Sequence, residues 1–339
     1  MIITGLCGVG KTVLLGAFEE TAREKRWATV ESEITKGADF APRIATLVRQ
    51  ALFQIAPRAR WSDRMSRAAG VLRSFTVTVS PDGIVSAGLG VDAVEGAADS
   101  GDLSVDLTEL MAALGEAARD QGTGVVFLFD EVQFLTSREL EALIAALHKT
   151  VQKSLPVTLV GAGLPSIPRL AGEAKSYAER LFRFPEIGPL PGTDATDALV
   201  GPAQSLGVEY EPGAAAKIVE ISEGYPYFLQ EYGKSIWDEA DGPRITVEDV
   251  EAIVPLVESK LDGSFFRVRA ERTTELELQY LRAMAELGSD AQKASDVARI
   301  MHRTSEQLGP TRSRLIEKGL LYTPGYAWTR SPSHSSTAT

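Results

Sequence analysis

The chain has 339 residues, of which 44% are hydrophobic and 24% charged, and these are ordinary values for a globular protein of two or three domains. Its 35 Lys and Arg residues are outnumbered by 46 Asp and Glu residues, which argues against a surface devoted to nucleic-acid phosphates. The single cysteine excludes a disulfide scaffold, and no segment has the roughly 20 consecutive apolar residues that a membrane span requires. The first residues lack the pattern of a signal peptide, so we expect a cytoplasmic protein without a membrane partner.

The first part of the chain alternates strand-like and helix-like segments, which is the pattern of a parallel sheet covered by helices. The expected elements are a strand at 1–4, a helix at 11–25, a strand at 27–34 and a helix at 42–55. Residues 75–105 interrupt this alternation. Phe75, Val77 and Val79 alternate with polar residues up to the turn sequence at 80–83, which predicts a hairpin, and the Gly-, Ala- and Asp-rich residues 88–102 predict a flexible loop.

The alternation resumes after this insertion. The expected elements are a helix from Asp106, a buried strand at 124–129, a helix at 136–151 that opens with a capping box, and strands at 156–161 and 181–187. We therefore predict an α/β core over residues 1–188, with a parallel sheet of five strands. The core ends at the segment GPLPG (188–192), whose two Pro and two Gly residues are typical of a linker.

Two smaller units are expected beyond the linker. Residues 189–263 are predicted to form a domain of about four helices. Residues 264–330 are predicted to form a third domain, with helices near 275–287, 295–301 and 310–318 and a short strand at 320–322. The polar tail at 331–339 is expected to be disordered.

One motif between the first strand and the first helix carries chemistry. The residues Gly5-Leu6-Cys7-Gly8-Val9-Gly10-Lys11-Thr12 fit the pattern G-x-x-x-x-G-K-[ST] at every fixed position. The glycines allow backbone N–H groups to surround phosphate oxygens at a helix N-terminus, the lysine reaches the β- and γ-phosphates, and the threonine hydroxyl is a magnesium ligand. The motif therefore predicts a site for ATP with Mg²⁺, and a chance glycine-rich turn is the weaker alternative.

Asp130 and Glu131 follow the buried strand at 124–129. A magnesium ion beside a phosphate-binding loop also needs a carboxylate from the end of a neighbouring strand, and Asp130 is the candidate. Glu131 is the candidate general base for the water that attacks the γ-phosphate. A polar end to the strand is the alternative interpretation, but the loop motif makes the metal site the stronger one.

Other reactive residues give weaker signals. Cys7 lies just before a predicted helix, where a thiol can act as a redox sensor. It occupies a variable position of the motif, however, and an ordinary loop residue is the preferred interpretation. The three histidines, His148, His302 and His334, are scattered without metal-ligand spacing, so no zinc site is predicted.

These motifs resemble those of the AAA+/STAND P-loop ATPases, in the bacterial and archaeal branch described as origin-recognition-complex-like. The resemblance covers about residues 1–330, with GLCGVGKT as Walker A and FLFDE as Walker B. Weaker matches are LVGAGLPSIPRLAGEAKSYAERLFRF as the sensor-1 strand and following helix, EGYPYFLQEYGKSIW in the lid, and RSRLIEKGLLY near the end of a winged-helix-like unit. The resemblance implies an AAA+ core, a helical lid over 189–263 and a winged-helix-like domain over 264–330.

The resemblance also implies roles for two further residues. Arg180 occupies the place of the arginine that reaches the γ-phosphate of a neighbouring subunit, which implies a homo-oligomer. Pro226 corresponds to the G-x-P element of STAND ATPases and is expected near the nucleotide base or ribose. The sensor-1 strand departs from the family because it ends in Val160-Gly161-Ala162-Gly163, without a polar residue to hold the attacking water, so slow hydrolysis is expected.

The partner of the third domain stays open between two hypotheses. Residues 264–339 carry eleven Lys and Arg against eight Asp and Glu, whereas the rest of the chain is acidic, so a basic domain that reads duplex DNA through Arg312 and Arg314 is one hypothesis. The other is a STAND-type signalling switch whose winged helix contacts protein.

Overall fold

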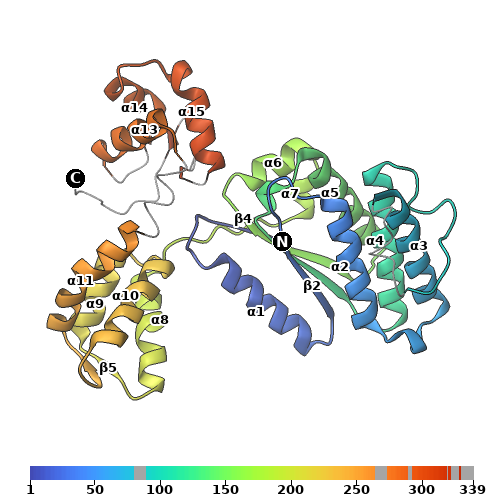
Figure 1. Cartoon of the computed structure of the whole chain (residues 1–339), viewed down its shortest axis with the longest axis horizontal. Helices are drawn as coiled ribbons and strands as arrows, with labels where there is room; N and C mark the ends of the chain where they lie inside the picture. The colour runs from blue at the N-terminus through green and yellow to red at the C-terminus, as the bar shows by residue number, and fades with distance from the viewer. Residues whose placement is uncertain (80–88, 264–272, 289–291, 319, 322–327, 330–339) are drawn as a thin grey trace. The chain divides into compact units, whose positions relative to one another are not determined.

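The computed structural model of the chain describes residues 1–79, 89–263, 273–288, 292–318, 320–321 and 328–329. The chain divides into two compact units (Figure 1). The first unit contains Met1–Thr4 and Lys11–Glu186, and the second contains Gly5–Gly10 and Ile187–Thr339. Within the described ranges, no helix is long and apolar enough to cross a membrane.

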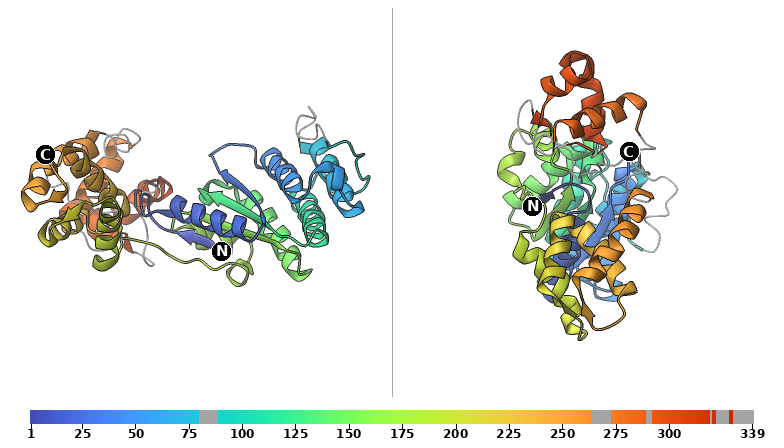
Figure 2. Two further views of the ribbon diagram at one scale, coloured as in Figure 1. Left: turned by 90° about the horizontal axis from the view of Figure 1, so that it is seen from below. Right: turned by 90° about the vertical axis from the view of Figure 1, so that its left-hand side faces the viewer.

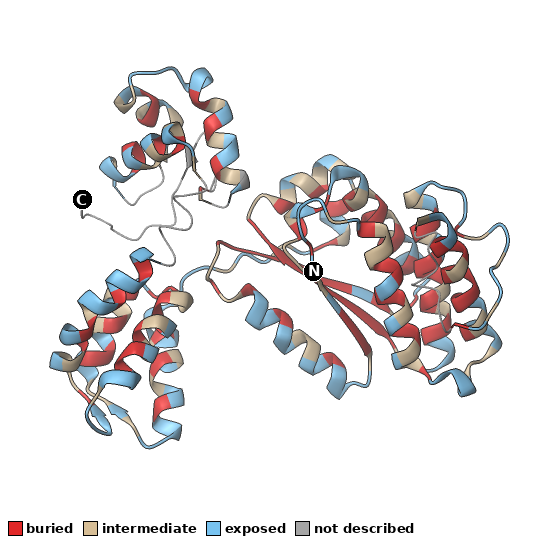
Figure 3. Cartoon of the chain, viewed as in Figure 1, coloured by how far each residue is buried: buried red, intermediate tan, exposed pale blue. Residues whose placement is uncertain are grey.

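The centre of the first unit is a parallel sheet of four strands in the order β1-β4-β3-β2. The strands are β1 (Ile2–Thr4), β2 (Ala28–Glu33), β3 (Val125–Asp130) and β4 (Val157–Gly163). In β3 the side chains from Val125 to Phe129 are all buried, as expected for a strand covered on both faces (Figure 3).

The predicted fifth strand at 181–187 is wrong. The segment does lie beside β1, because the backbone N–H groups of Ile2 and Thr4 donate to the carbonyl oxygens of Arg183 and Pro185 at 2.8 Å. Thr4 and Glu186 form only an isolated bridge. Pro185 has no N–H to donate, so the ladder cannot extend along this segment.

Helices cover both faces of the sheet. Figures 1 and 2 show α1 on one face and α2, α4 and α5 on the other. The helices of this unit are α1 (Lys11–Glu24), α2 (Phe40–Ile55), α3 (Asp63–Val79), α4 (Leu103–Asp120), α5 (Ser137–Gln152), α6 (Ile167–Ala174) and α7 (Ala178–Leu181), with the 3-10 turns η1 (Arg58–Arg60) and η2 (Val132–Phe134). The predicted capping box opens α5: Thr136 and Glu139 each accept a hydrogen bond from the other's backbone N–H.

The predicted hairpin is wrong over the residues that the structure describes. Helix α3 continues to Val79, so Phe75 and Val77 are helical. Ala68, Leu72 and Phe75 are fully buried at helical spacing, and this packing outweighs the alternation of apolar and polar residues. The predicted turn at 80–83 lies outside the described residues.

Residues 89–102 form a loop, as predicted, but this loop is packed against α3 and α4. Leu89 is fully buried, and Val94 is hydrogen-bonded through its N–H to Gly70 and through its carbonyl oxygen to the Ser74 hydroxyl. The buried carboxylate of Asp106 accepts hydrogen bonds from the backbone N–H groups of Ser100 and Gly101. These contacts hold the segment against α3 and α4, although its Gly-, Ala- and Asp-rich composition suggested a flexible loop.

The second unit contains a four-helix domain. Its helices are α8 (Gly192–Ser205), α9 (Pro212–Ser222), α10 (Pro226–Glu239) and α11 (Val247–Leu261), as the sequence predicted. Two short parallel strands, β5 (Glu209–Tyr210) and β6 (Arg244–Ile245), were not predicted. The core of this domain includes Leu6 and Val9 from the N-terminal loop.

The last described segment forms a separate small core. Its elements are α13 (Glu275–Glu286), β7 (Gln292–Lys293), α14 (Ala294–Ile300), α15 (Ser305–Glu317) and β8 (Trp328–Thr329), and β7 pairs with β8 in antiparallel fashion. Tyr280, Met284, Val297 and Leu315 fill the space between the helices. Residues 320–321 are not in a strand, contrary to prediction, and the predicted disordered tail at 331–339 lies outside the described residues.

Candidate functional site

The loop Gly5–Gly10 connects β1 to α1 and belongs to the second unit. Gly8 and Gly10 have φ angles of 87° and 90°, in the left-handed region that side chains disfavour. A Cβ atom on Gly5 would lie 2.7 Å from the carbonyl oxygen of Ile187. The glycines of the motif therefore have conformational and steric reasons to be glycine.

The loop is packed against the four-helix domain. Leu6 and Val9 are buried in a cluster with Tyr225 and Phe228, and Cys7 is a half-buried free thiol. The backbone N–H of Tyr227 donates to the carbonyl oxygen of Gly8 at 3.0 Å. Sequence reasoning did not predict this contact.

Pro226 lies next to that hydrogen bond. It is the first residue of α10, where a missing N–H is tolerated, and it is half-buried. Gly224, two residues before Pro226, has a φ angle of 70°, and a Cβ atom there would collide with the carbonyl oxygen of Leu190. Since Leu190 N–H also donates to the carbonyl oxygen of Gly224 at 2.9 Å, the start of α10 is held to the linker.

Lys11 and Thr12 begin α1, in the first unit. The Thr12 hydroxyl donates to Asp130 Oδ2 at 2.6 Å, so the first turn of α1 meets the end of β3. Lys11 is buried although it is a lysine. Sequence reasoning predicted both members of the Thr12–Asp130 pair, and the structure brings them together.

A magnesium ion suits the donor set of Thr12 and Asp130. Mg²⁺ commonly takes one or two protein oxygens and completes its octahedron with phosphate oxygens and water. Over the described part of the chain, no group of three or more His, Cys, Asp or Glu residues could hold a metal by itself. Two protein oxygens leave the rest of the octahedron to phosphate oxygens and water, so the pair fits a metal that is bound together with a phosphate ligand.

Glu131 has an unusual backbone. Its φ and ψ angles are 56° and 38°, the left-handed conformation, and its N–H donates to Asp130 Oδ1 at 2.8 Å. The carboxylate of Glu131 accepts a hydrogen bond from the side-chain amide of Gln133. Gln133 Oε1 accepts in turn from the backbone N–H of Leu164 at 3.1 Å. Gln133 was not a predicted site residue, and only its position two residues after Glu131 pointed to it.

Arg180 lies in the short helix α7, far along the sequence from Thr12 and Asp130. Its side chain is exposed, and it forms none of the ion pairs that the described residues make. The role of Arg180 between subunits stays a prediction.

Arg312 and Arg314 lie on α15, and both turn partly toward the protein. Arg312 is half-buried, and Arg314 Nε is 3.4 Å from Oε1 of Glu277, which is fully buried. Lys318 Nζ donates to the other oxygen of Glu277 at 2.7 Å. Burial alone would raise the pKa of Glu277, but hydrogen bonds from Lys318 and Thr274 outweigh it and hold that pKa below its usual value. Glu277 therefore neutralises part of the positive charge of Arg314 and Lys318 within the domain.

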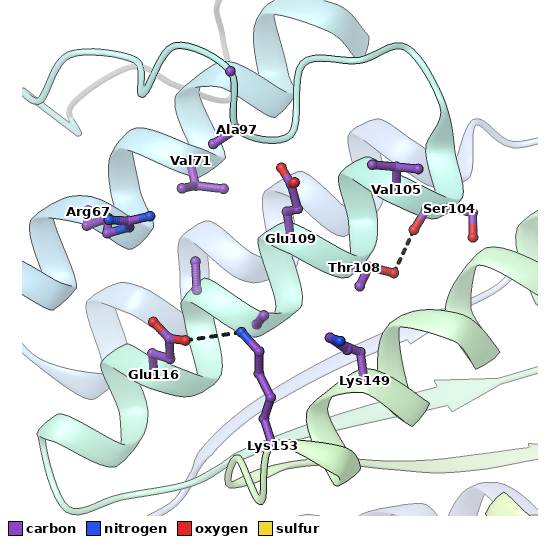
Figure 4. A pocket seen from close by; sticks show the side chains of 13 residues that line it. Arg67, Val71, Ala97, Ser104, Val105, Thr108, Glu109, Glu116, Lys149 and Lys153 are labelled. Atoms are coloured by element: carbon purple, nitrogen blue, oxygen red, sulfur yellow. Dashed lines mark hydrogen bonds and ion pairs between the residues drawn. The ribbon is translucent and has the colours of Figure 1, made fainter.

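The first unit also has a cavity of about 610 Å³ among α3, α4 and α5 (Figure 4). Arg67 and Lys149 lie on different walls of it, and Lys153 is paired with Glu116 at 3.4 Å. None of the predicted nucleotide, metal or catalytic residues lines this cavity. It is a separate feature from the Thr12–Asp130 pair.

Comparison with known proteins gives matches for two segments. Residues 1–160 match a family described as AAA ATPase domain, and residues 263–330 match a domain of unknown function, DUF8462. No curated protein matches the chain.

Two solved structures share the fold. The Walker-type ATPase PABY2304 of Pyrococcus abyssi aligns with a TM-score of 0.61 at 15% identity, over 98% of this chain and 87% of that one. The Aeropyrum pernix ORC2 protein, solved as ADPNP and ADP complexes, aligns with a TM-score of 0.54 at 16% identity, over 97% of this chain and 83% of that one. Residues 1–160 of this chain are therefore similar to the AAA ATPase domain family, and the chain shares its fold with these two solved structures.

Proposed function

We propose that the chain binds ATP with Mg²⁺, hydrolyses it slowly and passes its nucleotide state to the four-helix and C-terminal domains. The observation that carries this proposal is the 2.6 Å hydrogen bond between the Thr12 hydroxyl and the Asp130 carboxylate. In P-loop NTPases, a threonine of the loop and an aspartate at the end of a neighbouring strand hold the metal together.

In this proposal the loop residues bind the phosphates. The backbone N–H groups of Gly5–Gly10, among them those of Cys7, Gly8 and Val9, would donate to phosphate oxygens, and Lys11 would reach the β- and γ-phosphates. Thr12 and Asp130 would hold Mg²⁺, which neutralises charge on those phosphates. The left-handed conformations of Gly8 and Gly10 support this role, because they allow consecutive N–H groups to point to one side.

Glu131 is the proposed general base. The oxygen of a water molecule bonds to the γ-phosphorus, its proton passes to the Glu131 carboxylate, and the bond from that phosphorus to the β–γ bridging oxygen breaks to release ADP. Arg180 of a neighbouring copy of the chain would stabilise the charge that develops in this step. The absence of a polar side chain at Val160–Gly163, the end of β4, supports slow turnover.

The four-helix domain, at 189–263, is proposed to act as a lid. The hydrogen bond from Tyr227 to Gly8 supports this role because it joins the phosphate-binding loop to the first turn of α10. Pro226 precedes Tyr227 and is proposed to pack near the base or ribose of the nucleotide.

The C-terminal domain, at 264–330, is proposed to be winged-helix-like, which the three helices and the β7–β8 pair support. Its first candidate partner is duplex DNA, bound by Arg312 and Arg314. The ion pair between Arg314 and the buried Glu277 favours the second candidate, a protein partner as in STAND-type switches, because it occupies part of the charge that phosphates would need.

Turnover of ATP by the purified chain, with and without duplex DNA, tests the proposal. We expect ATP hydrolysis that requires Mg²⁺ and that Glu131→Gln abolishes while ATP stays bound. Glu173→Gln is the matched control, because Glu173 is an exposed carboxylate on α6. Stimulation by DNA that Arg312→Ala and Arg314→Ala reduce would support the DNA partner, and turnover indifferent to DNA would favour the switch. Normal turnover by Glu131→Gln would refute the general-base assignment.

A further inference from the structure

The side-chain amide of Gln133 connects the ends of two neighbouring strands. Its Nε2 donates to the carboxylate of Glu131, directly after β3, and its Oε1 accepts from the backbone N–H of Leu164, directly after β4, at 3.1 Å. Gln133 itself lies in η2, the turn that follows Glu131. One amide therefore links the proposed general base to the end of β4. The resemblance to AAA+/STAND ATPases made β4 the sensor-1 strand, on which a polar residue is expected.

No other side chain holds the Glu131 carboxylate, among the residues that the structure describes, through a hydrogen bond or an ion pair. The left-handed backbone of Glu131 also separates its side chain from the regular course of β3. The orientation of this carboxylate therefore depends on Gln133.

Gly163 explains how Gln133 comes to lie at the end of β4. A Cβ atom on Gly163 would collide with Gln133 Oε1 and with Cδ1 of Ile167. The last position of β4 thus has no space for a side chain of its own while Gln133 lies across it. The side chain of Gln133 therefore occupies the space in which a polar side chain at the end of β4 would lie.

We propose that Gln133 is the positioning residue for hydrolysis: it orients the Glu131 carboxylate and supplies, from the β3 side, the polar group that β4 lacks. This inference rests on the proposed role of Glu131 as general base. It implies that the slow ATP hydrolysis proposed for the chain depends on the side-chain amide of Gln133.

A structural role alone makes a different prediction. If Gln133 only satisfied the N–H of Leu164, its removal would lower stability without a selective effect on the chemical step. A positioning residue changes kcat and leaves ATP binding intact, because it acts on the general base and not on the bound phosphates.

The test uses Gln133→Met, which keeps the length of the side chain and removes its hydrogen bonds. We expect kcat to fall by about 100-fold, while KM and ATP affinity stay close to those of the parent chain. Loss of the hydrogen bond to the Leu164 N–H lowers stability, but it does not by itself produce a selective loss of kcat. Gln152→Met is the control, because Gln152 is an exposed glutamine at the end of α5.

Gly163→Ala is a second variant, in which the chain keeps Gln133 but the position of its side-chain amide changes. The added methyl group displaces the flexible end of Gln133, so we expect the same selective loss of kcat, and this variant keeps the test valid if Gln133→Met does not fold. Turnover within about twofold of the parent in both variants, beside an inactive Glu131→Gln, would overturn the inference and leave the proposed function standing. Normal turnover by Glu131→Gln would instead overturn the proposed function, and the inference with it.

Discussion

The backbone N–H of Tyr227 donates a hydrogen bond to the carbonyl oxygen of Gly8 at 3.0 Å. Tyr227 is the second residue of α10, and the first N–H groups of a helix have no acceptor within the helix itself. Gly8 supplies that acceptor from the middle of the phosphate-loop motif. A ligand that rearranges the backbone at Gly8 therefore acts directly on the first turn of α10.

We expect Gly8→Ala to weaken both ATP binding and the four-helix domain. The residue has a φ angle of 87°, and the new Cβ atom would lie 3.0 Å from Cβ of Tyr227. The backbone strain costs about 1–2 kcal/mol. Urea unfolding and ATP titration measure the two effects. Gly16→Ala is the control, because its added methyl group meets open space on α1 and alanine favours a helix. Parent-like affinity and stability of Gly8→Ala would contradict this prediction.

We expect Asp130→Asn to remove the Mg²⁺ dependence of ATP binding. Asp130 accepts from the Thr12 hydroxyl, and an amide is a weaker ligand for a hard cation than a carboxylate. Affinity for ATP should fall by about tenfold or more with Mg²⁺ present and should change little in a chelator. Titration of a fluorescent ATP analogue in both conditions measures the difference. Asp238→Asn, at an exposed position of α10, should behave like the parent chain. An equal loss of affinity with and without Mg²⁺ would place Asp130 outside the metal site.

The sequence was sufficient to predict the Thr12–Asp130 pair because both residues follow local rules. A glycine-rich loop before a helix and a carboxylate after a buried strand are each recognisable within a few residues. Four of the five predicted strands are present. The clearest of them is β3, whose continuous apolar segment predicts a buried strand. The fifth was wrong because Pro185 lacks a donor for the ladder.

The features that sequence reasoning missed depend on contacts between distant segments. Gln133 lies across β4 only because Leu164 offers an N–H there and Gly163 leaves space, and no local pattern reports this arrangement. Similarly, Arg314 was assigned to DNA from its charge and helix position alone. Its ion pair with Glu277, 37 residues earlier in the chain, required the packing of α13 against α15.

We expect Arg180→Ala to reduce turnover in an assembly of copies without reducing ATP binding. Its side chain is exposed and pairs with no described carboxylate, as a residue that acts on a neighbouring copy requires. Mixing Arg180→Ala with Glu131→Gln should restore part of the activity, because a mixed assembly contains sites with an intact Glu131 and an intact neighbouring arginine. Arg169→Ala, on α6, is the control for loss of an exposed arginine. Mixtures no more active than the sum of their components would exclude action in trans.

We expect Glu277→Gln to destabilise the C-terminal domain at neutral pH. The carboxylate is fully buried and ion-paired with Arg314 and Lys318, and loss of its charge leaves these two cations without that partner. The expected loss of stability is about 1–3 kcal/mol, as for a buried hydrogen bond to a charged group. Hydrogen exchange of the α13 and α15 amides measures it.

The pH dependence of this stability has a defined sign. Because the pKa of Glu277 is lowered in the folded chain, its stabilising effect is complete above the ordinary glutamate pKa of about 4.3 and is lost as the pH falls through the lowered value. Protection of α13 and α15 in the parent chain should therefore decrease at acidic pH, and Glu277→Gln should lack that component of the decrease. Glu275→Gln, an exposed position in the first turn of the same helix, should keep the pH dependence of the parent. Equal hydrogen-exchange protection of Glu277→Gln and the parent chain at neutral pH would contradict this prediction. It would show that Arg314 is available to an external partner, which would favour duplex DNA as the partner of the C-terminal domain.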